Sequence, residues 1–280
     1  MTVRAFVVGH PIAHSRSPLI HGHWLAEHGM AGSYERLNVL PEAFPAFLRG
    51  LAEAGWRGGN VTIPHKEAAA RLVDRPTDHA RRLGSVNTVW VESDGRIAGD
   101  STDGAGFLAG LDAALGSSWS AEAGTALVLG AGGAARAVVM ALVERGIERV
   151  LVANRTAERA TDLARLAPDR IGALAVADLP GALAQANLLV NTTRLGMPGE
   201  PALPVSLEAL PEGAVVADCV YVPLETPLLA AARARGLRAV DGLGMLLHQA
   251  VPGFARWFGV RPRVTPALRA RIVADLQASP

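Results

Sequence analysis

The chain is almost devoid of lysine. Of its 27 basic residues, one is a lysine, Lys66, and the other 26 are arginines. An arginine stays charged at physiological pH, whereas a lysine can be tuned toward neutrality and can then give or take a proton. Because arginine supplies nearly all of the positive charge, the single lysine is a candidate for proton transfer. The alternative is a solvated lysine at the start of a helix.

Cysteine, long apolar runs and blocks of like charge are also scarce. The one cysteine, Cys219, excludes an intramolecular disulfide and a cysteine-based zinc site, and it fits a reducing cytoplasm. No apolar run approaches the roughly 18 residues of a membrane span, and the N-terminus lacks the pattern of a signal peptide. The formal net charge is +1, without a basic block. We therefore expect a cytoplasmic protein with no metal, membrane or nucleic-acid partner.

What the chain does contain is an alternation of strand-like and helix-like segments. Its 280 residues are 50% apolar and 19% charged, which suits a globular enzyme. The alternation predicts an α/β fold with mostly parallel strands. We expect strands at 4–8, 34–39, 59–63, 125–129, 149–153, 188–191, 214–218 and 237–240, a hairpin of 87–92 with 97–100, and helices at 17–28, 41–54, 133–145, 156–166, 242–258 and 266–277.

A glycine-rich turn follows the expected strand at 125–129. Residues 130–135 read Gly-Ala-Gly-Gly-Ala-Ala, a match to Gly-x-Gly-x-x-Ala. The first glycine allows a tight turn, the second lets the backbone approach a pyrophosphate, and the last small residue lets helix and strand pack closely. In this context the pattern favours dinucleotide binding over a purely structural turn.

The end of the next expected strand indicates which dinucleotide binds. A site for NAD usually offers Asp or Glu there, which bonds the ribose 2′-hydroxyl. Here the chain has Asn154, Arg155 and Thr156, with Arg159 one helical turn later. A guanidinium can bind a 2′-phosphate with two hydrogen bonds, whereas a carboxylate would repel it. The pattern predicts NADP. The alternative is that the arginines are solvated residues at a helix start.

Short polar residues lie at several strand ends. Ser15 and Ser17 lie where a strand turns into a helix, so they suit a bound carboxylate, although Ser17 before a proline is also an ordinary helix N-cap. Asn60, Thr62 and Asn87 suit the orientation of hydroxyl groups, and their alternative is turn formation.

Asp103 can serve in two ways. It can cap the helix that follows it, or it can pair with Lys66. A partly buried lysine beside a carboxylate is a plausible acid/base unit. The two residues are far apart in the sequence, so this contact is an inference.

Together these segments resemble the shikimate dehydrogenases, and the resemblance covers almost the whole chain. It is carried in order by 9–18 (GHPIAHSRSP), 60–67 (NVTIPHKE), 86–88 (VNT), 102–104 (TDG), 130–134 (GAGGA), 154–156 (NRT) and 241–246 (DGLGML). That family reduces 3-dehydroshikimate to shikimate with NADPH, the reductive step before phosphorylation in aromatic amino acid (chorismate) biosynthesis. The resemblance implies the same reaction here.

The resemblance also implies roles for individual residues. Lys66 is expected to be the catalytic acid/base that protonates the C3 oxygen, and Asp103 its partner and a ligand of a substrate hydroxyl. The remaining substrate-binding positions are Ser15, Ser17 and Tyr221 for the carboxylate, and Thr62, Asn87 and Gln249 for the ring hydroxyls, with Asn60 as support. The cofactor-binding positions are Gly130, Ala131, Gly132, Gly133 and Ala134 at the diphosphate, Asn154, Arg155, Thr156 and Arg159 at the 2′-phosphate, Cys219 and Gly242 near the nicotinamide, and Asp78.

The domain organisation follows from the same resemblance. We expect an N-terminal α/β substrate domain of residues 1–102, completed by C-terminal helices in 242–280. A Rossmann-type doubly wound domain of 103–241 is expected to bind NADP, with the active site in the cleft between the two. The chain is expected to be a monomer or a homodimer.

Two residues depart from the family pattern, and three other functions are alternatives to a shikimate dehydrogenase. Ser101 stands where the family commonly has Asn, and Arg194 replaces a frequent proline in the loop after a Rossmann strand. A quinate/shikimate or an aminoshikimate dehydrogenase would use the same chemistry, although the paired serines favour shikimate over quinate, which carries an extra hydroxyl. A non-catalytic NADP-binding sensor on the same scaffold would have no need of Lys66.

Overall fold

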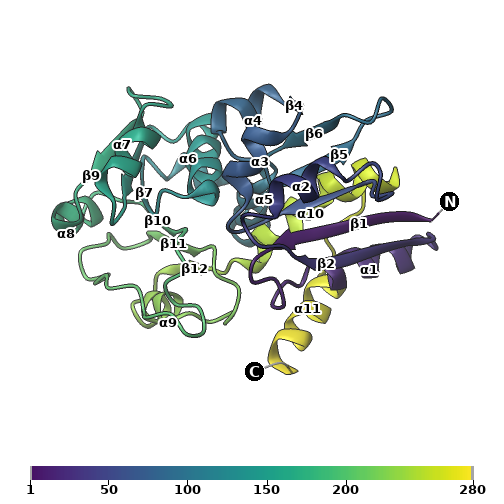
Figure 1. The fold of residues 1–280 in the computed structure, drawn as a ribbon. Helices are drawn as coiled ribbons and strands as arrows, with labels where there is room; N and C mark the ends of the chain where they lie inside the picture. The colour runs from purple at the N-terminus through teal and green to yellow at the C-terminus, as the bar shows by residue number, and fades with distance from the viewer. Residues whose placement is uncertain (1, 279–280) are drawn as a thin grey trace. The chain divides into compact units, whose positions relative to one another are not determined.

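The computed structural model describes residues 2–278, which form two compact α/β units (Figure 1). The first unit comprises residues 2–103 and 249–275, and the second comprises residues 104–248 and 276–278. Each unit is built around its own six-stranded sheet.

The sheet of the first unit is mixed, with the strand order β2-β1-β3-β5-β6-β4. Strands β2, β1 and β3 pair in parallel, β3, β5 and β6 pair antiparallel, and β4 pairs with β6 in parallel. The strands are β1 (Val3–Gly9), β2 (Gly32–Asn38), β3 (Gly58–Val61), β4 (Arg75–Pro76), β5 (Thr88–Val91) and β6 (Ile97–Asp100). The helices are α1 (Ser17–Glu27), α2 (Phe44–Arg49), α3 (Lys66–Leu72), α4 (Asp78–Leu83), the C-terminal part of α10 (Leu243–Phe258) and most of α11 (Pro266–Ala278).

Aromatic side chains form much of the core of this unit. Phe6 of β1 contacts Phe47 and Trp56 edge to face, with ring centroids 5.2 and 5.3 Å apart. A second aromatic group contains Trp24 of α1 and Phe254 of α10, whose ring centroids are 5.4 Å apart. Because large buried rings contribute heavily to hydrophobic stabilisation, these clusters hold α1, α2 and α10 in place.

The sheet of the second unit is parallel throughout, with the order β9-β8-β7-β10-β11-β12. This is the 3-2-1-4-5-6 order of the Rossmann fold, in which ligands bind where the strand order reverses, here between β7 and β10. The strands are β7 (Thr125–Leu129), β8 (Arg149–Ala153), β9 (Ile171–Leu174), β10 (Leu188–Asn191), β11 (Val215–Asp218) and β12 (Arg238–Val240). The helical segments are α5 (Asp103–Leu115), η1 (Ser117–Ala121), α6 (Gly133–Arg145), α7 (Ala157–Ala164), η2 (Val176–Asp178), α8 (Leu179–Leu183), α9 (Pro227–Ala234) and the start of α10.

The predicted α/β class and Rossmann-type sheet are confirmed, and several element boundaries differ. The helix expected at 41–54 is reduced to α2, because Gly50 ends it and turns follow. Ser17 is the first residue of α1, and Arg16 occupies the N-cap position, so the interpretation of Ser17 as the N-cap is wrong. Within residues 2–278, no helix is long and apolar enough to cross a membrane.

Candidate functional site

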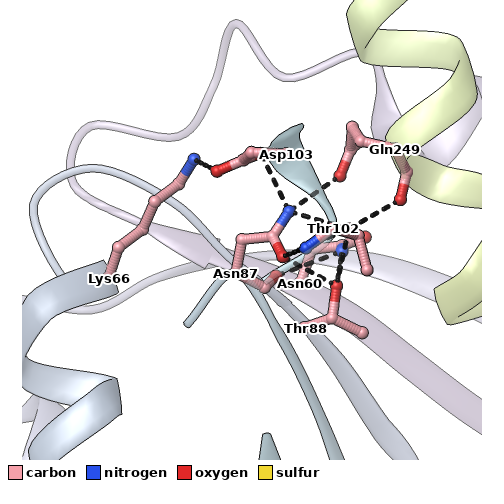
Figure 2. A network of polar contacts seen from close by, with 7 residues as sticks. All are labelled: Asn60, Lys66, Asn87, Thr88, Thr102, Asp103 and Gln249. Carbon is pink, nitrogen blue, oxygen red and sulfur yellow. Dashed lines mark hydrogen bonds and ion pairs between the residues drawn. The ribbon is translucent and has the colours of Figure 1, made fainter. Parts of the chain in front are cut away.

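Lys66 and Asp103 form a partly buried ion pair in the first unit. Lys66 begins α3, and its Nζ donates a 2.6 Å hydrogen bond to Oδ2 of Asp103, the first residue of α5 (Figure 2). The two side chains are only 14% and 5% exposed. Removing one partner of such a pair leaves an uncompensated buried charge. The single lysine is therefore not a solvated residue at a helix start.

His65 fixes the turn that presents Lys66. Its ring lies parallel to that of Phe44, with the centroids 4.3 Å apart, and its Nε2 lies 2.8 Å from the Val39 carbonyl oxygen. Burial lowers the pKa of His65, so the neutral ring can donate from Nε2 to that carbonyl. The backbone oxygen of Lys66 accepts the N–H of Val86 at 3.0 Å. Contacts with two neighbouring segments thus anchor the start of α3.

Asn87 holds the second oxygen of Asp103. Its Oδ1 accepts the backbone N–H of Thr102 at 2.7 Å, and because a backbone N–H can only donate, the orientation of the amide is determined. Its Nδ2 therefore donates to Oδ1 of Asp103 at 2.9 Å and to Oε1 of Gln249 at 3.1 Å. Asp103 thus accepts from Lys66 on one oxygen and from Asn87 on the other (Figure 2).

Asn60 and Thr88 extend this network into the sheet. Nδ2 of Asn60 donates to the backbone oxygen of Asn87 and to Oγ1 of Thr88, both at 3.2 Å. The Thr102 hydroxyl donates to the backbone oxygen of Gln249 at 2.9 Å, which ties α10 to the end of β6. Asn60, Asn87, Thr88 and Thr102 are each no more than 5% exposed. These side chains therefore form one satisfied polar network.

The serine turn lies before α1 in the same unit. Oγ of Ser15 accepts the backbone N–H of Ser17 at 3.3 Å, so Ser15 supplies the local turn and keeps its own O–H to donate. Nε of Arg36 donates to the backbone oxygen of Ser15 at 2.7 Å. Nε of Arg16, between the serines, lies 2.6 Å from Oδ2 of Asp275 on α11. Side chains from β2 and α11 thus hold the turn.

The glycine-rich turn joins β7 to α6 in the second unit. Gly130 has φ +111°, and a Cβ there would lie 2.5 Å from Oγ1 of Thr192, so no larger residue fits the turn. Gly132 is the N-cap of α6. Among the described residues no side chain caps the helix, and a Cβ on Gly132 would meet no atom within 4 Å. A helix N-terminus that is uncapped and approachable has N–H groups available to an anion. These features fit a dinucleotide diphosphate.

The residues expected at the 2′-phosphate follow β8. Nδ2 of Asn154 donates to the backbone oxygen of Thr156 at 2.9 Å, which shapes the turn into α7. Arg155 and Arg159 are both exposed. In the part of the chain that the structure describes, no acidic side chain pairs with Arg155. Its guanidinium is thus available to an anion.

Cys219 and Gly242, both expected near the nicotinamide, are in contact. A Cβ on Gly242 would lie 2.5 Å from the Cys219 carbonyl oxygen, so only glycine permits this approach. The preceding Asp218 is 2% exposed and accepts from Val220 N at 2.9 Å and from Thr226 Oγ1 at 2.8 Å. Burial raises the pKa of Asp218 although these bonds oppose the shift. Sequence reasoning missed Asp218, which organises this loop.

Three of the expected site residues remain: Tyr221, Thr62 and Asp78. Tyr221 is half-buried in the loop after β11, in the second unit. Thr62 is half-buried directly after β3. Asp78 begins α4 in the first unit, and its 93% exposed side chain pairs with Arg81 at 2.5 Å. The assignment of Asp78 to the cofactor stays a prediction.

The structure shows the contacts of the two residues that depart from the family pattern, Arg194 and Ser101. Arg194 pairs with Glu200 at 2.8 Å, so it stabilises its own loop. Oγ of Ser101 is buried and has no hydrogen-bond partner within residues 2–278. An unpaired buried hydroxyl destabilises the fold modestly. Within residues 2–278, the Ser101 hydroxyl makes no hydrogen bond to Lys66 or Asp103.

Three family models match the chain. Residues 7–89 match the shikimate dehydrogenase substrate binding domain, residues 114–198 match shikimate/quinate 5-dehydrogenase, and residues 242–270 match the shikimate 5'-dehydrogenase C-terminal domain. A curated shikimate dehydrogenase (NADP(+)) of Methylobacterium radiotolerans is 70% identical over 276 residues, which are 98% of each chain. The chain belongs to the shikimate dehydrogenase family.

Solved structures of this family share the whole fold. Shikimate 5-dehydrogenase of Thermus thermophilus, in complex with NADP(H) and shikimate, has a TM-score of 0.85 and 39% identity, covering 98% of this chain and 100% of that one. Quinate dehydrogenase of Corynebacterium glutamicum, in complex with NAD, has a TM-score of 0.88 and 30% identity, covering 98% and 99%. The same fold therefore occurs in a shikimate dehydrogenase that binds NADP(H) and in a quinate dehydrogenase that binds NAD.

Proposed function

We propose that this protein is an NADP-dependent shikimate dehydrogenase that reversibly reduces 3-dehydroshikimate to shikimate in aromatic amino acid biosynthesis. The observation that carries the proposal is the partly buried 2.6 Å contact between Lys66 and Asp103. A sensor that only binds NADP has no use for a proton-transferring lysine held in this way. The 70% identity to a curated shikimate dehydrogenase supports shikimate over quinate as the substrate.

The second unit would hold the cofactor. The uncapped start of α6 and the turn at Gly130 suit the diphosphate, and the unpaired guanidinium of Arg155 suits the 2′-phosphate. Cys219 and Gly242, whose backbones pack closely, would lie beside the nicotinamide. The reduced cofactor, when bound, supplies the hydride for the reaction. Residues 103–241 thus form the proposed NADP-binding domain.

The first unit would hold the substrate. The Ser15 and Ser17 hydroxyls would bind the carboxylate, since each O–H is a donor to an anion. The side chains of Thr62, Asn87 and Gln249 would bind the ring hydroxyls. Residues 1–102, completed by 242–280, form the proposed substrate domain.

Lys66 performs the proton transfer in this mechanism. Its ammonium gives a proton to the C3 carbonyl oxygen during reduction and recovers one from the hydroxyl during oxidation. Asp103 holds the ammonium and accepts a hydrogen bond from a neighbouring substrate hydroxyl. Because Asn87 donates to the other carboxylate oxygen, Asp103 cannot rotate away from Lys66 without losing a bond. The low exposure of the pair strengthens both interactions.

Initial rates with purified protein test the proposal. We expect NADP-linked oxidation of shikimate, with slower oxidation of quinate and a higher KM for NAD. Lys66→Ala serves as the negative control, because it should retain the fold and bind NADP while losing turnover. A parent protein that reduces or oxidises none of these substrates, yet binds NADP, would instead support the sensor.

A further inference from the structure

Tyr34 begins a continuous chain of hydrogen bonds that ends at Asp103. Its phenol O–H donates to Oδ1 of Asn60 at 2.6 Å. Tyr34 is 8% exposed, and burial raises the pKa of its hydroxyl well above the usual value. The phenol therefore stays protonated near neutral pH. A hydroxyl that remains a donor sets the direction of the bonds that follow it.

The bonds that follow lead from Asn60 to Asp103. Because Oδ1 of Asn60 accepts from Tyr34, its Nδ2 donates to Oγ1 of Thr88 at 3.2 Å. The Thr88 hydroxyl lies 3.1 Å from Oδ1 of Asn87, to which it can donate, and 3.2 Å from the Thr102 hydroxyl. Nδ2 of Asn87 donates to Oδ1 of Asp103 at 2.9 Å. Figure 2 shows this chain from Asn60 onward.

We propose that Tyr34 is a positioning residue for the catalytic pair, which acts through the Asn60 amide and not through contact with the substrate. The proposal rests on the proposed function, since the chain ends at a residue given a catalytic role there.

The surroundings of Tyr34 allow its hydroxyl to be removed without its ring. The ring stacks on His21, with centroids 3.9 Å apart and an interplanar angle of 12°, and lies 5.9 Å from that of Trp257. Tyr34→Phe keeps these contacts and deletes the donor to Asn60. The Asn87 carbonyl still orients Nδ2 of Asn60, so the amide keeps its orientation and its buried Oδ1 loses the phenol donor. A buried acceptor without its donor is unfavourable, so Asn60 shifts and the bonds that lead from it to Asp103 are disturbed.

Trp24→Phe is the matched control. It removes a buried N–H that donates to the Arg263 carbonyl at 3.0 Å. Trp24 belongs to the same aromatic group, with its ring 5.6 Å from that of His21, and it makes no hydrogen bond to Asn60 within residues 2–278. Both variants therefore lose one buried donor to an acceptor, but only Tyr34→Phe interrupts the chain to Asp103.

Steady-state kinetics with shikimate and NADP⁺ provide the first test. Because Thr102 also fixes Asn87, we expect a partial loss in Tyr34→Phe of about fivefold in kcat/KM for shikimate, the effect of one neutral hydrogen bond. The KM for NADP⁺ should not change. Trp24→Phe should lose a comparable amount of thermal stability but keep the parent kcat/KM. Equal kinetic losses in the two variants, or none in Tyr34→Phe, would overturn the proposal.

NMR of the ligand-free protein provides a test that is independent of catalysis. With ¹⁵N-labelled asparagine, Tyr34→Phe should shift the side-chain amide signals of Asn60 and Asn87 and leave that of Asn191, in the second unit, in place. Unmoved Asn60 and Asn87 signals would refute the link from Tyr34. If the parent failed to oxidise shikimate, the proposed function would fail, whereas shifted amides in that same protein would still support the link.

Discussion

Oδ1 of Asn87 accepts the backbone N–H of Thr102 at 2.7 Å. This bond determines which atom of the Asn87 amide contacts Asp103, because it orients the amide nitrogen toward the carboxylate. The bond joins residues at neighbouring strand ends, since Thr88 of β5 pairs with Asp100 of β6. The sheet register therefore determines which way a site side chain donates.

Asn87→Asp tests that relationship. One carboxylate oxygen can still accept the Thr102 N–H, but the other would face Oδ1 of Asp103 where an N–H now donates. Losing a hydrogen bond to a charged group costs about 1.5–3 kcal/mol, so we expect kcat/KM to fall by roughly 10- to 100-fold. Two adjacent carboxylates share a proton at a raised pKa, so the loss should shrink as the pH is lowered. A pH profile of kcat/KM that parallels the parent's would contradict this prediction.

Lys66→Arg and Lys66→Ala separate proton transfer from charge. Arginine keeps the positive charge but cannot shuttle a proton, so it should not restore activity. General acid/base catalysis typically contributes 10²–10⁴-fold, and we expect a loss of about that size in kcat for both variants. The Kd for NADP, measured by nucleotide fluorescence, should remain close to the parent's. Substantial turnover in Lys66→Arg would leave Lys66 a purely electrostatic role.

The second unit was more predictable from the sequence than the first. Its parallel strands are covered on both faces, so β7, β8 and β10 appear as short apolar runs, and each lies where it was expected. Helix α5 was not predicted, because Gly104 and Gly110 lower its helix propensity. In the structure Gly110 is needed for packing, since a Cβ there would lie 2.9 Å from the backbone of Gly244.

Site residues were predicted where a residue type was informative by itself. Lys66 was singled out as the only lysine, and the contact with Asp103 that was inferred from chemistry is present. The sequence does not single out Thr88 or Thr102, although both lie in segments that carry the family resemblance. Their role depends on the pairing of β5 with β6, which a local pattern does not reveal.

Ser15→Ala and Ser17→Ala should raise the KM for shikimate more than they lower kcat. Both hydroxyls would bind a carboxylate remote from the reacting carbon, so they should contribute nearly equally in the ground and transition states. One lost hydrogen bond to a charged group costs about 1.5–3 kcal/mol. Ser33→Ala, which removes a hydroxyl that donates to Glu35 on β2, is the control. Parent-like shikimate binding in both test variants would place the carboxylate elsewhere.

Asp112 on α5 should make stability depend on acid pH. Arg145 donates to both of its oxygens, at 2.8 and 2.7 Å, and Trp119 donates at 2.8 Å. The hydrogen bonds from Arg145 lower the pKa of Asp112 below its usual range. Half-buried His248 also interacts with Asp112, and its partial burial lowers the pKa of its imidazole, so it adds little charge at neutral pH. A carboxyl whose folded pKa is depressed stabilises the fold above its unfolded pKa and loses that effect as the pH falls through the folded value.

Asp112→Asn should therefore lower the free energy of unfolding near pH 7 by about 1–3 kcal/mol. The difference from the parent should persist down to the unfolded pKa of about 3.9 and then shrink. Asp162→Asn is the control, since its pair with Arg165 is exposed and should contribute little. Urea denaturation at several pH values measures both. A difference that stays constant through the acid range would show that Asp112 acts by packing alone.

Arg155→Ala should change cofactor choice. The 2′-phosphate of NADP carries up to two negative charges, and the planar guanidinium can bind it with two hydrogen bonds. We expect NADP binding to weaken by about 1.5–3 kcal/mol, the range for hydrogen bonds to charged groups. NAD has only a hydroxyl at that position, and Asn154 offers it no carboxylate, so its KM should change little. Added salt should also reduce the parent's preference for NADP, because an exposed phosphate contact is screened.

Arg165→Ala is the matched control for this prediction, because it removes the same charge from the other end of α7, where Arg165 pairs with Asp162. If Arg155 binds the 2′-phosphate, only Arg155→Ala should lose discrimination between the two cofactors. The measurement is KM for NADP⁺ and NAD⁺ in parent and variants at fixed ionic strength. Equal losses for both cofactors in Arg155→Ala would mean that the residue supports the turn after β8. A parent that already prefers NAD would overturn the assignment, because the charge at the end of β8 would then have no phosphate to bind.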